Sequence, residues 1–433
     1  MRFLLLNPNW SFEGSIYFGC RYPHLPLEYG YAQALLRQRH HEAVIIDAQL
    51  ENLSLEQVRA AAAAYRPDFL VVTTAPSYLF WRCAPPELRV PLEALQAVRD
   101  LAGKIAVVGP HGSTTPRAVL RKLEPDAVVL GECEEILPKL AGDWKEIPSL
   151  CYLDHGEPVI QGGPHACDMA RLPALDWPQE AIRLHRHQHH RFDAAPSGPG
   201  AEMETTRGCP YHCTFCAKDN FRNSFRRRPL CAVLVELDGL LAKGVEYIYF
   251  IDEIFLPYAD LLEALARRKI RFGIQTRIDL WAPPMIDLLG RAGCVSIEAG
   301  VESITEDGRA LLDKRCKLST ADLAERLIYA RQRVPFVQAN LLESQNDNPA
   351  EVEAWRAELR QHGVWANRPV PLFPYPGSPE YLRRWGAPDD VAWERAYREY
   401  LAAFSEFSDI QEERPLALEQ LERSAAGPQS WTK

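Results

Sequence analysis

Three closely spaced cysteines are the residues of this chain with the clearest chemical potential. Cys209, Cys213 and Cys216 have the spacing C-x3-C-x2-C and directly follow a strand-like segment. Three thiolates on one tight loop can bind three corners of an iron–sulfur cube and leave the fourth iron open to a substrate. The alternatives are a zinc site or unligated thiols, but structural zinc needs four closed ligands, usually in C-x2-C pairs. No second pair occurs nearby, so the spacing predicts a [4Fe–4S] cluster.

This loop resembles that of the radical S-adenosylmethionine (SAM) enzymes, including the aromatic Phe215 just before the third cysteine. The resemblance implies that the open iron holds the amino and carboxylate groups of SAM and that Phe215 lies at the SAM site. It further implies that the reduced cluster cleaves SAM to a 5′-deoxyadenosyl radical. An external electron donor such as flavodoxin or ferredoxin is then required.

Polar residues at two later strand ends extend the likeness. Asp252 and Glu253 end an apolar run in the segment 247–255, where the family holds the methionine ammonium; a solvated turn is the alternative. Arg277 closes the next strand and resembles the family arginine that reaches the methionine carboxylate. A planar, bidentate guanidinium suits that role, and a surface salt bridge is the alternative.

Two further strand ends resemble the family, and one element departs from it. Glu302 and Ser303 stand in a G-V-E-S sequence, which the family places near the ribose of SAM, and 373–379 resembles a turn after the sixth strand. Many relatives carry G-x-P-G-E-T after the fifth strand, whereas residues 340–348 read NLLESQNDN here. The ligand contact at that turn is therefore not carried over.

The first part of the chain resembles the cobalamin-binding domain that precedes many radical SAM domains. The segments that carry the likeness are Pro26–Gly30, Ala43–Asp47, Pro67–Thr73, Val107–His111 and Gly131–Glu134. The resemblance assigns cobalamin contacts to Pro110, His111, Gly131 and Glu132, with the nucleotide tail along the sheet near these loops. The D-x-H-x-x-G motif that supplies a cobalt-ligating histidine is absent. A doubly wound domain without a cofactor is the alternative, since fold does not settle function.

Three other features have a functional and a structural interpretation. The aromatic segment 78–89 could cap cobalamin or line the substrate cavity, or it could be a packed surface loop. Four histidines between His185 and His190 could bind a divalent metal, but a solvated linker is favoured. The eight scattered cysteines are expected to be small, buried apolar residues.

Strand-like apolar runs alternate with helical spacing over residues 1–141, ending in a helix at 134–141. This alternation predicts right-handed crossovers and a doubly wound, mostly parallel α/β sheet. A connector with a hairpin near 149–160 is expected over 142–200.

A second α/β series is expected over 201–386, with its last strand at 368–373. It contains about six strand–helix units, enough for a partial or full (β/α) barrel. The tail, 387–433, is expected to be helical, and its aromatic stripe is expected to pack in a core. That stripe comprises Trp393, Tyr397, Tyr400, Leu401 and Phe404.

Composition narrows the class of protein. The 433 residues are 47% hydrophobic and 25% charged, which is ordinary for a globular protein. The net charge of −9 argues against a nucleic-acid partner, because nucleic-acid binders are more often basic. The apolar run Arg2–Leu6 is followed by Asn7 and Pro8 and is too short for a signal peptide. A cytoplasmic protein without a membrane span or a disulfide framework is therefore expected.

Together these features predict a cobalamin-dependent radical SAM enzyme that methylates an unactivated carbon, or phosphorus, of a small molecule. No individual catalytic residue is assigned. Three alternatives remain. The first is another radical enzyme with the same domains, which cyclises, rearranges a ring of or oxidises its substrate. The second is a tRNA methylthiotransferase-like enzyme, and the third is an iron–sulfur or cobalamin sensor without turnover. The acidic charge and the short tail disfavour the tRNA enzyme.

Overall fold

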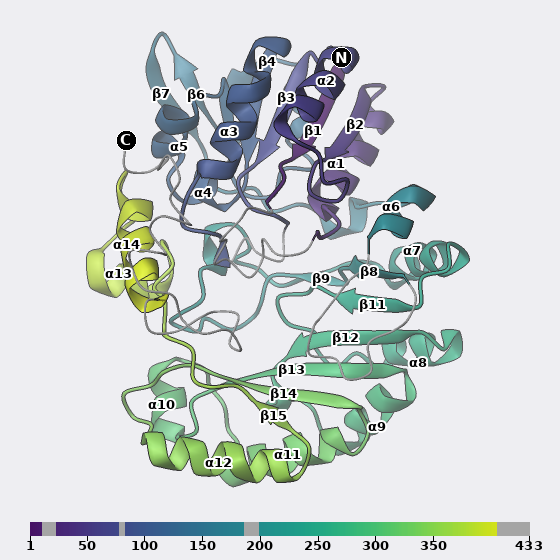
Figure 1. The fold of residues 1–433 in the computed structure, drawn as a ribbon, viewed down its shortest axis with the longest axis vertical. Coiled ribbons are helices and arrows are strands. Elements are labelled where there is room, and N and C mark those ends of the chain that lie inside the picture. The colour runs from purple at the N-terminus through teal and green to yellow at the C-terminus, as the bar shows by residue number, and fades with distance from the viewer. Residues whose placement is uncertain (11–22, 78–82, 186–198, 405–433) are drawn as a thin grey trace. The chain divides into compact units, whose positions relative to one another are not determined.

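The computed structural model describes residues 1–10, 23–77, 83–185 and 199–404, and the chain forms two compact units (Figure 1). Unit 1 comprises Met1–Trp177, Cys216–Asn223 and Phe373–Lys433. Unit 2 comprises Pro178–Phe215 and Ser224–Leu372. Parts of the segments 78–89 and His185–His190 discussed above lie outside the described residues.

Unit 1 contains a seven-stranded sheet in the order β2-β1-β3-β4-β5-β6-β7, of which the first five strands are parallel. The strands are β1 (Arg2–Asn7), β2 (Glu42–Asp47), β3 (Phe69–Thr73), β4 (Lys104–Val108), β5 (Ala127–Val129), β6 (Leu150–Asp154) and β7 (Glu157–Gln161). The strand order reverses between β1 and β3, which is where open α/β sheets bind their ligands. The predicted doubly wound sheet is confirmed, and the predicted hairpin is β6–β7.

Helices cover both faces of this sheet. They are α1 (Leu27–Gln38), α2 (Leu55–Tyr65), α3 (Arg89–Val98), α4 (Pro110–Thr114) and α5 (Pro116–Leu123). Along β1, Leu4 and Leu6 join one core cluster while Phe3 and Leu5 join the other. Successive side chains of a strand point to opposite faces, so a strand buried on both faces is apolar throughout.

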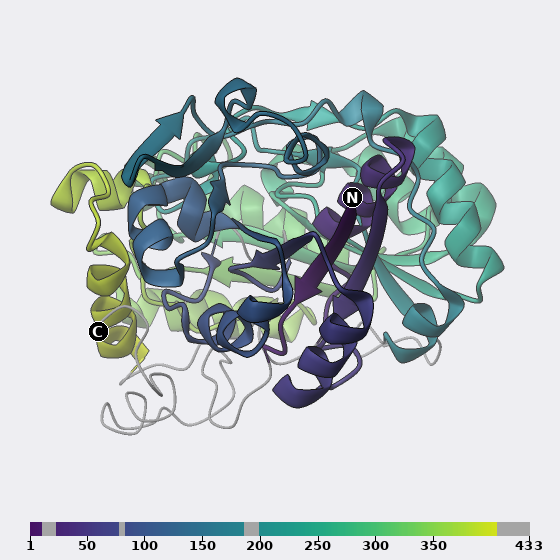
Figure 2. The same cartoon turned by 90° about the horizontal axis from the view of Figure 1, so that it is seen from above.

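The C-terminal helices belong to unit 1. Helices α13 (Pro379–Trp385) and α14 (Ala392–Phe404) lie beside the blue helices of this unit (Figures 1 and 2). Trp393 and Tyr397 of α14 are buried in the same core cluster as Leu120 of α5, and Glu394 pairs with Lys122 at 2.6 Å. Tyr400 and Leu401 belong to the same cluster, so these four members of the stripe pack in a core, as predicted, and that core is the one of the N-terminal sheet. The burial of the fifth member, Phe404, lies outside the described residues.

Unit 2 contains a six-stranded parallel sheet in the order β15-β14-β13-β12-β11-β8, with β8 and β15 at its two edges. This order describes a partial barrel. Its strands are β8 (Gly200–Met203), β11 (Tyr247–Phe250), β12 (Arg271–Thr276), β13 (Cys294–Glu302), β14 (Phe336–Leu341) and β15 (Trp365–Ala366).

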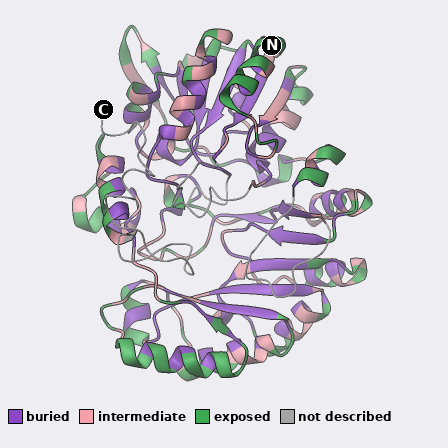
Figure 3. Ribbon diagram, viewed as in Figure 1, coloured by how far each residue is buried: buried purple, intermediate pink, exposed green. Residues whose placement is uncertain are grey.

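Helices flank this sheet on its outer side, and their outward surfaces are exposed while the strands are buried (Figure 3). The connecting helices are α7 (Leu230–Ala242), α8 (Ala259–Arg268), α9 (Pro283–Arg291), α10 (Glu306–Leu311), α11 (Thr320–Arg331) and α12 (Pro349–Gln361). Helix α6 (Gln179–Leu184) precedes the first strand.

Two predicted elements are wrong, and proline explains both. The segment 134–141 contains only a single 3-10 turn, Leu137–Lys139, because Pro138 within a helix would clash with the carbonyl four residues earlier. The last strand is β15 rather than 368–373, since Pro369 and Pro371 cannot donate to a strand ladder. Of the later segment, only Val370 forms an isolated bridge.

Within the described ranges, no helix has the length and apolar character needed to cross a membrane.

Candidate functional site

The cysteine loop follows β9 (Thr206–Arg207), which comes shortly after the edge strand β8. Cys209, Cys213 and Cys216 are all partly exposed. All three stand between β9 and the 3-10 turn Lys218–Asn220, and a [4Fe–4S] cluster on these thiols stays a prediction.

Asp252, at the end of β11, organises the start of this loop. Its carboxylate is buried and accepts hydrogen bonds from the backbone amides of Thr205 (2.7 Å) and Thr206 (3.1 Å) and from the Thr205 hydroxyl. Burial raises the pKa of Asp252 to about 7, although these hydrogen bonds oppose the shift. The structure thus places this predicted SAM residue against the backbone that leads into the cysteine loop.

Glu253 lies next to Asp252 and is only partly buried. One of its oxygens accepts a hydrogen bond of 2.8 Å from the backbone amide of Gly208, the residue before Cys209. Gly208 has φ +77°, a conformation that side chains other than glycine rarely adopt. The two acids therefore hold successive parts of the same loop.

Arg277 follows β12 and is 6% exposed, so the predicted alternative of a surface salt bridge does not describe it. Its guanidinium pairs with Asp279 through contacts of 2.7 and 3.2 Å. The guanidinium carbon also lies 4.1 Å from the ring centroid of Tyr211, within the cysteine loop. The Nη1 atom of Arg277 is buried and has no hydrogen-bond partner in the described parts of the chain. A buried, unpaired donor is costly, and a ligand carboxylate would satisfy it.

The end of β13 carries the next predicted pair. Glu302 has φ +68° and accepts a hydrogen bond of 2.7 Å from Lys314. The Ser303 hydroxyl donates to Asp347 at 2.7 Å, and Asp347 also accepts from the amides of Ile304 and Thr305. Ser303 is therefore held by the segment that departs from the family pattern.

Sequence reasoning missed Tyr211 and Asp347. Tyr211 stands between two cluster cysteines, and an aromatic residue at that position was the available signal for a stacking contact. Asp347 follows β14 in the segment 340–348, which the sequence comparison considered only because it lacks the G-x-P-G-E-T turn of the family. Phe215 is partly exposed, and the preceding residue, Thr214, donates its amide to the carbonyl of Leu312 at 3.1 Å.

In unit 1, the predicted cobalamin residues Pro110 and His111 begin helix α4. His111 is fully buried, its Nε2 lies 2.9 Å from the carbonyl of Pro85, and its ring centroid is 4.1 Å from that of Trp393. Burial lowers the pKa of His111 to about 3, so the ring is neutral at physiological pH. This imidazole is packed inside the protein.

The low pKa of His111 predicts a pH dependence of unit 1 stability. Because the pKa is about 3 in the folded state and ~6.5 in the unfolded state, the unfolded state binds more protons below pH 6.5. The stabilisation is complete above that pH and is lost as the pH falls toward 3. We expect the free energy of unfolding to fall by about 2 kcal/mol between pH 7 and pH 5, measured by urea denaturation. This slope should flatten in His111→Phe and persist in His155→Phe, whose original side chain is 94% exposed; equal slopes would contradict the assignment.

Gly131 and Glu132 follow β5. Gly131 has φ +79°, and a Cβ there would lie 2.3 Å from the backbone nitrogen of His165, so the glycine permits close backbone approach. Glu132 is fully buried, accepts from the Cys167 amide at 2.6 Å and pairs with Arg222 at 3.2 Å. These contacts make Glu132 a link between protein segments of unit 1.

A different residue supplies the polar group that fits a ligand at this sheet. Thr74 directly follows β3, one of the two strands at the switch point, and is fully buried. Its hydroxyl has no hydrogen-bond partner among the described residues. A Cβ at Gly109 would lie 2.2 Å from this hydroxyl, so the glycine leaves it room. An unsatisfied hydroxyl at the carboxyl end of β3 fits the polar periphery of cobalamin.

The histidine-rich segment is described only at His185. Its ring is fully buried, with Nδ1 2.7 Å from the carbonyl of Gly200 and Nε2 2.9 Å from the carboxylate of Glu202. The remaining histidines of the segment lie outside the described residues.

Comparison with known proteins finds a different family model for each of the two parts of the chain. Residues 20–141 match the family model of the B12 binding domain, and residues 203–354 match that of the radical SAM superfamily. These models imply cobalamin, a [4Fe–4S] cluster and SAM as cofactors.

Three curated relatives are similar over longer stretches. An uncharacterized methyltransferase of Pyrococcus horikoshii is 24% identical over 64% of this chain and 61% of its own length. The anaerobic magnesium-protoporphyrin IX monomethyl ester cyclase of Cereibacter sphaeroides is 23% identical over 86% of this chain and 63% of its own. Hopanoid C-3 methylase of Methylococcus capsulatus is 28% identical over 58% and 49%. The chain thus spans about six tenths of the length of the first two relatives.

Two solved structures share the fold. The radical SAM methyltransferase TsrM of Kitasatospora setae, with cobalamin and a [4Fe–4S] cluster bound, has a TM-score of 0.70 and 19% identity, over 88% of this chain and 77% of its own. The cobalamin-dependent SAM radical enzyme OxsB, with aqua-cobalamin and SAM bound, has a TM-score of 0.71 and 17% identity, over 94% and 67%.

Proposed function

We propose that this chain, whose residues 20–141 match the B12 binding domain and whose residues 203–354 match the radical SAM superfamily, is a cobalamin-dependent methyltransferase. Its substrate is a small molecule methylated on an unactivated carbon or on phosphorus. The observation that carries the proposal is the cysteine loop, which is held by two adjacent acids after β11. Beside it lies Arg277, whose Nη1 has no hydrogen-bond partner among the described residues. The names of two relatives, a methyltransferase and a methylase, support methyl transfer.

When bound, the cluster supplies the electron that cleaves SAM to a 5′-deoxyadenosyl radical, and cobalamin carries the methyl group. Arg277 donates its unpaired N–H to the methionine carboxylate, and Asp279 keeps the guanidinium in that orientation. Asp252 and Glu253 fix the backbone of the cysteine loop in one conformation. Such preorganisation is the protein's contribution, because the radical chemistry belongs to the cofactors.

The test requires no knowledge of the substrate. Full-length protein, loaded anaerobically with iron, sulfide and cobalamin, is incubated with reductant and SAM labelled in its methyl group. We expect 5′-deoxyadenosine, S-adenosylhomocysteine and label in the corrin fraction. Formation of 5′-deoxyadenosine without any label in the corrin fraction would contradict methyl transfer, and absence of both products would favour a sensor.

A radical cyclase is the second candidate, because the cyclase relative matches 86% of this chain. It would produce 5′-deoxyadenosine without transferring the methyl label. The labelled-SAM experiment therefore separates the two functions.

Thr74 gives a separate prediction for cobalamin. We expect Thr74→Val to weaken cobalamin binding about 2- to 12-fold, because one net hydrogen bond is worth ~0.5–1.5 kcal/mol. The measurement is an absorbance titration of cobalamin at constant iron content. The control is Thr73→Val, because the Thr73 hydroxyl already donates to the carbonyl of Ala75 at 2.8 Å. Equal affinities for the Thr74 variant and the control would remove Thr74 from the cobalamin site.

A further inference from the structure

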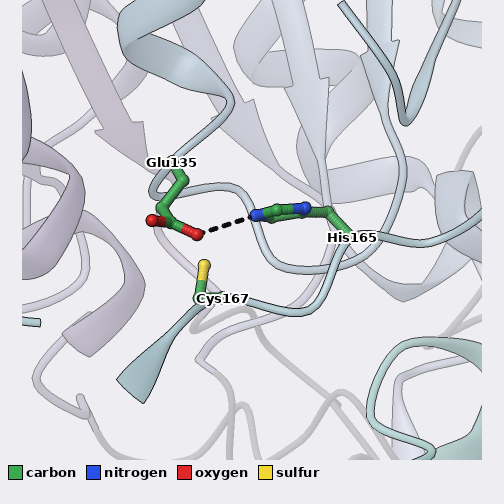
Figure 4. Close-up of side chains that lie close together, drawn as sticks. All are labelled: Glu135, His165 and Cys167. Atoms are coloured by element: carbon green, nitrogen blue, oxygen red, sulfur yellow. Dashed lines mark hydrogen bonds and ion pairs between the residues drawn. The ribbon is translucent and has the colours of Figure 1, made fainter. Parts of the chain in front are cut away.

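Unit 1 contains a group of potential metal ligands outside the cysteine loop. The ligand atoms of Glu135, His165 and Cys167 all lie within 4.8 Å of one another (Figure 4). Cys167 is fully buried, whereas the side chains of Glu135 and His165 are 14% and 22% exposed. The group therefore has a buried thiol at its base and two ligands that solvent can reach.

The backbone holds the two segments of this group together. The backbone amide of His165 donates a hydrogen bond of 2.9 Å to the carbonyl of Leu130. The carbonyl of His165 accepts one of 3.0 Å from the backbone amide of Glu132. These contacts form a parallel bridge between Gly131 and His165. The Glu132 carboxylate also accepts from the amide of Cys167. Backbone hydrogen bonds therefore hold the segment with His165 and Cys167 beside the loop that carries Glu135. The positions of the three ligands do not depend on side-chain packing alone.

The side-chain contacts suit a cation. His165 Nε2 lies 3.0 Å from one oxygen of Glu135, whose other oxygen lies 3.3 Å from Arg171. The Cys167 sulfur lies 3.2 Å from a carboxylate oxygen of Glu134. Two carboxylates therefore surround one thiol and one imidazole, and Arg171 neutralises part of this negative charge.

We propose that Glu135, His165 and Cys167 bind one Zn²⁺ ion, with a water molecule as the fourth ligand. Zinc is the metal that combines thiolate, imidazole and carboxylate in a tetrahedral shell. Metal–ligand distances of ~2.0–2.3 Å place tetrahedral ligands about 3.3–3.6 Å apart. Ligand atoms that lie within 4.8 Å of one another would therefore have to approach each other by at most about 1.5 Å. Binding releases the Cys167 thiol proton, and the Glu134 carboxylate, 3.2 Å from the sulfur, can accept it. The ion would cross-link the loop after β5 to the 165–167 segment.

The test is the zinc content of the full-length protein after cluster reconstitution, incubation with ZnCl2 and desalting. We expect about one zinc per chain in addition to about four irons. His165→Ala and Cys167→Ser should each lose at least about tenfold in zinc affinity, a loss typical of an altered metal shell, and keep their iron. His155→Ala and Cys294→Ser are the controls, since they remove an exposed imidazole and a buried thiol elsewhere.

X-ray absorption at the zinc edge identifies the ligands. One sulfur at ~2.3 Å with nitrogen and oxygen at ~2.0–2.2 Å is expected. A shell of three sulfurs would assign the zinc to the cysteine loop, and an all-nitrogen shell would assign it to the histidine-rich segment; both would overturn the proposal. Zinc retained unchanged by His165→Ala, or no bound zinc at all, would also overturn it. Because His165 is partly exposed, its replacement tests binding without removing a core residue.

Discussion

Replacing Cys213 by alanine is expected to abolish SAM cleavage and to remove the cluster's charge-transfer absorption. In the proposed cluster three thiolates would hold three irons of the cube. Losing one would leave two ligands for a cluster whose fourth iron would bind SAM. The iron content after anaerobic reconstitution should fall from about four per chain to below about one. The measurements are iron analysis, visible absorption, and quantitation of 5′-deoxyadenosine.

The control for Cys213→Ala is Cys231→Ala. Cys231 is an exposed thiol of helix α7, and its replacement should leave iron content and SAM cleavage unchanged. Cys213 is itself partly exposed, so alanine leaves no large cavity and the melting temperature should stay within a few degrees of the original. A folded Cys213→Ala protein that still produced 5′-deoxyadenosine at the original rate would overturn the cluster assignment.

The parallel strands were predictable because most of them are buried on both faces. The segments Arg2–Leu6 and Glu246–Ile251 are nearly continuous apolar runs, and they correspond to β1 and β11 within one or two residues. Helical spacing was equally informative at 230–243, where α7 ends one residue earlier than predicted. These patterns follow from local burial, which a linear sequence records.

Long-range partners were not predictable, because no local pattern specifies them. The carboxylate of Glu132 pairs with Arg222, which is 90 residues away in sequence, whereas its expected contact with cobalamin stays a prediction. The tail helix was expected to pack in a core, but the sequence did not indicate which one. In the structure it packs in the core of the N-terminal sheet. Only the tertiary structure shows which buried charge or aromatic face meets which partner.

The cysteine loop shows the same difference between local patterns, which were predictable, and long-range contacts, which were not. Its three ligands are adjacent in sequence, so spacing and residue type sufficed to identify them. The acids after β11 were expected near the methionine ammonium, and in the structure they accept hydrogen bonds from Thr205, Thr206 and Gly208. Their placement as SAM ligands stays a prediction, and these contacts add a positioning role.

Replacing Arg277 by alanine is expected to weaken SAM binding by about 2–5 kcal/mol, which corresponds to roughly 30-fold to several thousand-fold in affinity. Three observations support a loss of this size. Arg277 is buried, its Nη1 has no partner among the described residues, and its guanidinium stacks on Tyr211. The variant loses the donor for the carboxylate and also leaves Asp279 without its partner. Binding is measured by titrating SAM into the reduced protein and following the electron paramagnetic resonance of the cluster.

Two further variants separate a ligand contact from general damage. Arg271→Ala removes an exposed arginine from the other end of β12, where it pairs with Glu246, and should leave SAM affinity unchanged. Arg277→Lys retains the charge but loses the planar fork, so we expect only partial recovery of affinity. Iron content should be the same in all three variants, because Arg277 contacts the side chain of Tyr211 and no cluster ligand is replaced. Unchanged SAM affinity in a folded, iron-replete Arg277→Ala protein would mean that the unpaired Nη1 faces no ligand, and that the arginine serves only to hold Tyr211 and the cysteine loop.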